Sequence, residues 1–179
     1  MRRQQTAWHP LYVRFLRRVL PRGSFRVQSE VQLSQQPLRA DVVVLRRRGG
    51  PPAASSILRS ARVFDIAPVT VGELKGPKDV LHAADFPTLI GYTAHYMAAE
   101  GLEDPAAVQM MTVAGRLSEE YRKQVALFRY PLTEVEPGLW LSPPAPHPLC
   151  IIETEVIADL LLRFFSREVL RRPARLWDS

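Results

Sequence analysis

The 179-residue sequence contains a single cysteine, Cys150, and only four histidines. One cysteine cannot form an internal disulfide, so the chain is not a small disulfide-stabilised domain, and we expect a reducing, cytoplasmic compartment. The histidines are His9, His82, His95 and His147. They are too scattered for the close ligand spacing of a structural zinc site.

Long hydrophobic runs are also missing. No stretch reaches the roughly 18 uninterrupted apolar residues that span a bilayer. The apolar segment near the N-terminus is broken by Arg14, Arg17 and Arg18, which the core of a signal peptide does not tolerate. Because 46% of the residues are hydrophobic and 23% are charged, the composition is that of a globular protein. We therefore expect one soluble domain over residues 1–179, without a membrane segment.

Lysine is scarce, and the positive charge is unevenly distributed. Only three of the 24 basic residues are lysines, namely Lys75, Lys78 and Lys123. Residues 1–48 contain eleven arginines against Glu30 and Asp41, a net charge of +9, whereas residues 49–179 contain 13 basic and 16 acidic residues. An arginine-rich segment is typical of proteins that bind the phosphates of nucleic acid. A gene of high G+C content, which favours arginine, alanine and proline, gives the same composition without any partner.

The hydrophobic spacing in the first half of the chain predicts a helix followed by three strands. The helix covers residues 8–20, and the strands cover 25–33, 38–46 and 69–75, the last with a possible extension back to Val63-Phe64. A turn at 35–37 separates the first two strands, and the stretch 46–60 has the glycine, proline and serine content of a loop.

The second half predicts alternating helices and strands. Asp85 is a candidate N-cap for a helix that ends at Gly101, and Ser118 is a candidate N-cap for a helix that runs to about residue 128. A strand at 107–114, a hairpin around 136–138, a strand at 149–153 and an amphipathic helix at 156–170 complete the order. The expected class is α/β, with a mixed sheet flanked by helices in one domain.

Three residues within these strands indicate chemistry. Glu73 and Lys75 are two positions apart in a strand, so their side chains point to the same face. Asp41 lies among valines, where a carboxylate costs several kcal/mol unless it is paired or coordinates a cation. Two carboxylates beside a lysine form an oxygen-rich site suited to Mg²⁺ or Mn²⁺. In such a site the metal activates a phosphodiester and a water, while the lysine orients or deprotonates that water and offsets negative charge.

Asp41 followed by Glu73-Leu74-Lys75 at the end of a strand resembles the PD-(D/E)XK nuclease superfamily, which has a restriction endonuclease-like αβββαβ core. The resemblance covers about residues 8–115 and leaves 116–179 as an accessory layer with a hairpin and a helix. It implies that Asp41 and Glu73 bind the metal, that the backbone carbonyl of Leu74 is a further ligand, and that Lys75 is the catalytic lysine.

The sequence departs from this family pattern at several positions. Ala40 stands before Asp41 where the family has proline, and the first helix has no acidic residue, so Glu30 is the candidate for an additional metal ligand. The run Thr88-Leu89-Ile90-Gly91-Tyr92 is similar to the Gln-x-x-x-Tyr helix of RecB-like nucleases, with threonine in place of glutamine. The subfamily is therefore left open.

Weaker candidates surround this core. Arg14, Arg17, Arg18 and Lys78 are candidates for phosphate contacts, and Thr88, Tyr92 and His95 are candidates for lining the cleft. Each has a plain alternative as a solvated surface residue or a packing residue. The apolar residues Leu160, Leu161, Phe164 and Phe165 form either a homodimer face or an ordinary contact with the sheet.

Four hypotheses follow from the sequence. The first is a metal-dependent nuclease that cleaves nucleic acid, with DNA as the expected substrate. The second is a catalytically inactive nuclease-like domain that binds DNA or forms a homodimer, and the third is a regulatory subunit whose basic face docks an acidic protein. The fourth treats Glu73 and Lys75 as an exposed cross-strand charge pair, with Asp41 facing solvent.

Overall fold

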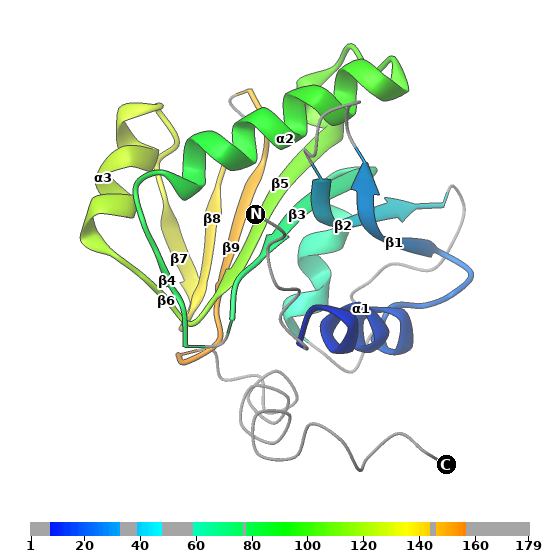
Figure 1. Ribbon diagram of the computed structural model, residues 1–179, viewed down its shortest axis with the longest axis horizontal. Coiled ribbons are helices and arrows are strands. Elements are labelled where there is room, and N and C mark those ends of the chain that lie inside the picture. The colour runs from blue at the N-terminus through cyan, green and yellow to red at the C-terminus, as the bar shows by residue number, and fades with distance from the viewer. Residues whose placement is uncertain (1–7, 33–38, 48–58, 77, 144–145, 157–179) are drawn as a thin grey trace.

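The computed structural model describes residues 8–32, 39–47, 59–76, 78–143 and 146–156 (Figure 1). In chain order the elements are α1 (Trp8–Val19), β1 (Phe25–Gln32), β2 (Arg39–Arg46), the 3-10 helix η2 (Arg59–Asp65), β3 (Val69–Leu74), β4 (Val80–Leu81), α2 (Asp85–Glu100), the 3-10 helix η3 (Pro105–Ala107), β5 (Val108–Ala114), β6 (Arg116–Leu117), α3 (Glu119–Leu127), β7 (Thr133–Glu136), β8 (Leu139–Ser142) and β9 (Leu149–Glu153).

Seven of the strands form one mixed sheet in the order β1-β2-β3-β5-β9-β8-β7. The first three strands are antiparallel neighbours, whereas β5 is parallel to β3 and β9 is parallel to β5. The strands β8 and β7 continue the sheet in antiparallel pairs, and β4 pairs with β6 separately. The expected α/β class with a mixed sheet is confirmed, and β7, β8 and β9 extend the same sheet as the first three strands.

Helices cover both faces of the sheet (Figure 1). On one face, Leu16 of α1 and its helical neighbours pack against Val42 and Leu74. On the other face, α2 and α3 pack against the strands through Phe86 and Tyr121 among others. All seven residues of β5 are buried, because this strand lies in the centre of the sheet between two helical layers. Together these layers fix the end of β3, next to which α1 and α2 both begin.

Several local predictions are confirmed. The predicted helix at 8–20 is α1, and Gly101 follows α2 with a left-handed φ of 64°, which glycine adopts without a steric penalty. Ser118 is the N-cap of α3, where its Oγ accepts a hydrogen bond of 3.0 Å from the Tyr121 amide. Among the residues that the structure describes, no helix is both long and apolar enough to pass through a bilayer.

Other predictions need correction. Val63 and Phe64 belong to η2, which packs on the sheet, and do not extend β3. Asp85 is the first residue of α2. The N-cap is Ala84, whose methyl group cannot form a cap hydrogen bond. The short strands β4 and β6 were not predicted. The turn at 35–37, most of the loop 46–60, the helix at 156–170 and its residues Leu160, Leu161, Phe164 and Phe165 fall outside the described residues.

Candidate active site

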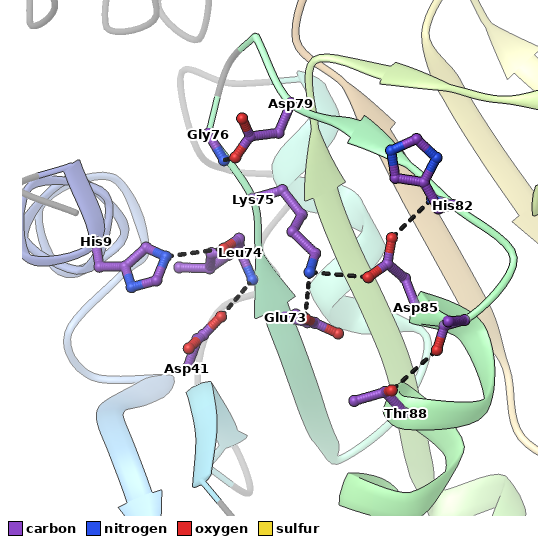
Figure 2. Close-up of polar contacts among 11 residues, drawn as sticks. His9, Asp41, Glu73, Leu74, Lys75, Gly76, Asp79, His82, Asp85 and Thr88 are labelled. Atoms are coloured by element: carbon purple, nitrogen blue, oxygen red, sulfur yellow. Dashed lines mark hydrogen bonds and ion pairs between the residues drawn. The ribbon is translucent and has the colours of Figure 1, made fainter. Parts of the chain in front are cut away.

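The candidate site lies at the end of β3, where the pairing with β2 stops (Figure 2). The last pair of the β2–β3 ladder is Val42 with Gly72, so Asp41 and Glu73 come next at opposed positions. There the carboxylate of Asp41 takes the place of a backbone partner, because its Oδ2 accepts a hydrogen bond of 2.8 Å from the Leu74 amide. Two like charges at opposed positions destabilise a sheet, so the fold tolerates a local cost at this point.

Glu73 is the most unusual group in the site. Its side chain is only 3% exposed, and its Oε1 lies 2.8 Å from the ammonium of Lys75. The other oxygen, Oε2, is buried and has no hydrogen-bond partner among the described residues. Burial raises the pKa of Glu73 above its ordinary value; Lys75 opposes this increase, and the negative charges of Asp41 and Asp85 add to it.

A second buried glutamate shows what a complete set of partners looks like. Glu153 is 5% exposed, close to the value for Glu73. Its Oε1 accepts a bond of 2.8 Å from the Leu117 amide, and its Oε2 accepts one of 2.6 Å from the Trp140 indole. Buried carboxylate oxygens are normally satisfied in this way. The unpartnered oxygen of Glu73 is therefore a feature of this site and not of buried glutamates in this fold.

The ammonium of Lys75 lies between two carboxylates. Besides its contact with Glu73, it lies 2.9 Å from Oδ1 of Asp85 at the start of α2. Burial by itself would lower the pKa of Lys75, but the two carboxylates outweigh burial, and the pKa is raised. Lys75 is therefore a fixed positive charge. The idea that Lys75 forms an exposed charge pair with Glu73 is wrong, because Glu73 is buried.

His9 also reaches this site, although the sequence argument did not assign it a role. Its Nε2 donates a hydrogen bond of 2.8 Å to the backbone carbonyl of Leu74, across 65 residues of sequence. Figure 2 shows the imidazole approaching Leu74 from α1, on the opposite side from Lys75. The carbonyl that the family resemblance identifies as a metal ligand thus lies against an imidazole nitrogen. A lone histidine at the start of a helix carries no sequence signal for such a contact.

Glu30 is placed differently from the other acidic candidates. The β1–β2 register pairs Ser29 with Val42 and Val31 with Ala40, which brings Glu30 opposite Asp41. However, Glu30 has a left-handed φ of 52° and an exposed side chain. The carboxylates that contact Lys75 are those of Glu73 and Asp85. Glu30 thus lies at the same level of the sheet as Asp41 and Glu73 but has an exposed side chain, and the second carboxylate that contacts Lys75 is that of Asp85 in α2.

The basic candidates lie on α1 and in the turn after β3. Arg14 and Arg18 are exposed, and Lys78 is exposed in the turn that follows Lys75. Arg17 is exposed as well, but its guanidinium donates two hydrogen bonds, of 3.3 and 3.2 Å, to the Val27 carbonyl of β1. Arg17 thus ties α1 to the sheet, while Arg14, Arg18 and Lys78 present their charge to solvent.

The three residues of α2 that were predicted to line the cleft, Thr88, Tyr92 and His95, differ in burial and in contacts. Thr88 donates a hydrogen bond of 2.9 Å to the Ala84 carbonyl within the first turn of the helix, close to Asp85 (Figure 2). Tyr92 is buried in a cluster with Val43 of β2. His95 is exposed. Of the three, only Thr88 lies beside the residues that hold Lys75.

No protein-family model, curated protein or solved structure matches this chain. The site must therefore be interpreted from its own geometry. Within the described ranges, no three side chains of histidine, cysteine, aspartate or glutamate are grouped closely enough to hold a metal by themselves. A closed structural metal site is therefore not formed by these residues, whereas Mg²⁺ commonly uses only one or two carboxylates and completes its shell with water and phosphate oxygens.

Proposed function

We propose that this protein is a metal-dependent nuclease that hydrolyses phosphodiester bonds in nucleic acid, with DNA as the expected substrate. The observation that carries the proposal is the buried Glu73 oxygen that has no partner among the described residues, next to Asp41 and beside a fixed lysine. A buried, unpaired carboxylate oxygen is costly, and a divalent cation is the partner that would offset that cost.

The residues at the end of β3 fit Mg²⁺ or Mn²⁺. Glu73, Asp41 and the Leu74 carbonyl would supply oxygen ligands, which both ions prefer. The distance from His9 Nε2 to Leu74 O is 2.8 Å. This hydrogen bond would hold the Leu74 carbonyl in place, and the second lone pair of its oxygen would remain available to the cation.

The chain's own residues then have distinct roles. When bound, the cation would polarise the scissile phosphate and lower the pKa of a water molecule. Asp41 and Glu73 hold negative charge where the cation is needed. Lys75 places a positive charge at the same edge, where it offsets the charge that develops on the phosphate and orients the attacking water.

Two further features support this proposal. Apart from the two-residue strand β4, the elements α1, β1, β2, β3, α2 and β5 follow the αβββαβ order that the PD-(D/E)XK resemblance implies. In addition, α1 carries His9 at the site and the exposed Arg14 and Arg18 further along. These arginines would contact the phosphate backbone without reading sequence.

A cleavage assay tests the proposal. Supercoiled plasmid, linear duplex, single-stranded DNA and RNA are incubated with the protein in Mg²⁺, in Mn²⁺ or in EDTA. The informative variants are Glu73→Gln and Lys75→Met. Matched controls are Glu155→Gln and Lys123→Met, which change the same residue types in exposed ion pairs that do not involve Glu73, Lys75 or Asp85.

We expect cation-dependent cleavage by the wild type and both controls, and a loss of about 100-fold or more in Glu73→Gln and Lys75→Met. Cleavage that persists in both site variants would overturn the proposal. A wild type that binds DNA with a steep salt dependence but cleaves none of the four substrates would instead support the binding-only alternative.

A further inference from the structure

The shared position of Lys75 raises the question of what holds it once Glu73 has another partner. The Lys75 ammonium contacts Glu73 Oε1 at 2.8 Å and Asp85 Oδ1 at 2.9 Å, and the two carboxylates come from different elements (Figure 2). Under the proposed function, Glu73 is a cation ligand. A divalent cation and an ammonium then compete for the same carboxylate and repel each other.

Asp85 is held independently of Glu73. Its Oδ2 accepts a hydrogen bond of 2.7 Å from the His82 amide, so Oδ1 is directed to Lys75 by a backbone contact. Asp85 is also in the first turn of the 16-residue helix α2, where the helix dipole favours a negative charge. Its orientation and its charge are therefore both fixed without any contribution from β3.

Lys75 needs such an anchor because its side chain has a route to solvent. It is 21% exposed, and lysine has a long, flexible side chain. If Glu73 bound a divalent cation and the Lys75 ammonium had no other partner, the ammonium would turn outward to solvent. We propose that Asp85 is a positioning residue that keeps the Lys75 ammonium at the site while Glu73 binds the divalent cation, an inference that rests on the proposed function.

The small number of lysines makes this proposal measurable. The chain has only three lysines, so NMR spectra of protein with ¹⁵N-labelled lysine side chains contain at most three ammonium signals, and the exposed Lys78 and Lys123 exchange their ammonium protons rapidly with water. An ammonium held in ion pairs exchanges its protons slowly and gives a visible signal, and a spectrum of Lys75→Met identifies which signal is that of Lys75. Binding of Mg²⁺ is followed separately through the backbone amide of Leu74, which is bonded to Asp41.

The test compares the wild type, Asp85→Asn and Asp79→Asn, each with and without Mg²⁺. Asp79 is the matched control, because its carboxylate accepts a hydrogen bond of 2.7 Å from the Gly76 amide in the same loop and its removal deletes the same charge. We expect the Lys75 signal in all three proteins without Mg²⁺. With saturating Mg²⁺ it shifts but persists in the wild type and Asp79→Asn, and it is lost in Asp85→Asn.

The activity readout is expected to follow the NMR result. The kcat of Asp85→Asn falls by about 10- to 100-fold, with an unchanged KM for DNA, as is typical when the support of an active group is removed. A Lys75 signal that persists in Mg²⁺-bound Asp85→Asn would overturn this inference alone. Failure of Mg²⁺ to shift the Leu74 amide or the Lys75 signal of the wild type would overturn the proposed function together with it.

Discussion

The glycine before Glu73 offers a quantitative test of how β2 and β3 are joined at the site. A Cβ added to Gly72 would lie 2.7 Å from Val42 Cγ1 and 2.9 Å from Met111 Cε. The end of the methionine side chain can move, but a valine in a strand is restricted at χ1. Gly72→Ala therefore forces β2 and β3 apart at their last pair before the carboxylates.

The expected cost follows from over-packing, which typically destabilises a protein by about 1–3 kcal/mol. A small gain from the less flexible unfolded chain, of about 0.4–1 kcal/mol, partly offsets it. We expect Gly72→Ala to lower the free energy of unfolding by about 1–2 kcal/mol, which corresponds to a decrease in Tm of roughly 2–8 °C for a chain of this size.

Gly91 provides the matched control for the same chemical change. It lies inside α2, and a Cβ there would have no atom within 4 Å. Gly91→Ala should therefore raise the free energy of unfolding by about 0.5–1 kcal/mol, because alanine is the better helix former. The two substitutions are thus expected to have opposite signs.

Urea denaturation of Gly72→Ala, Val42→Ala, the double variant and Gly91→Ala is the assay. Because Val42→Ala removes the clashing methyl group, the double variant should recover at least about 1 kcal/mol relative to the sum of the single effects. Additive effects, or a Gly72→Ala variant as stable as Gly91→Ala, would refute the account of close packing between β2, β3 and β5.

Three further predictions concern the charges and the caps. Lys75→Met leaves Glu73 buried without its cation, so without added metal the free energy of unfolding in urea should fall by about 2–3 kcal/mol, whereas Lys123→Met should be neutral. The pKa of Glu73 is raised in the folded state, so above about pH 4.3 the folded protein binds more protons than the unfolded one. The contribution of Glu73 to the free energy of unfolding is therefore lost as the pH rises through the folded pKa. Differences in Tm between wild type and Glu73→Gln across this range measure that loss, and a difference that does not change with pH contradicts it. Ser118→Ala removes the N-cap bond of α3 and should cost about 1 kcal/mol by urea denaturation, while Ser118→Asp should restore most of it.

Much of the fold could be predicted from the sequence because its signals are local. The apolar stripe of α1, the cap at Ser118 and the left-handed Gly101 each depend on a few neighbouring residues, and all three are found. The two-residue strands β4 and β6 are too short for any periodicity. Val63 and Phe64 are apolar in η2 just as they would be in a strand, so their pattern could not separate the two structures.

The site was predictable only in part, because only some of its contacts join residues that are close in sequence. Glu73 and Lys75 share a face because strands alternate with period two, which the sequence contains. The register that brings Asp41 opposite Glu73 is a property of the folded sheet. Asp85 at a helix start is typical of a cap, and only the structure brings Lys75, ten residues earlier, against it. The contact of His9 with Leu74 spans 65 residues and depends on how α1 packs.

The central claim is that Oε2 of Glu73 has no partner among the described residues because a divalent cation binds there. Its most direct test is a titration of Mn²⁺ followed by electron paramagnetic resonance, in wild type, Glu73→Gln and the exposed control Glu155→Gln. The account predicts one bound ion per chain in the wild type and the control, and an affinity at least about tenfold weaker in Glu73→Gln. A wild type that binds no Mn²⁺, or a Glu73→Gln variant that binds it equally well, would contradict the account.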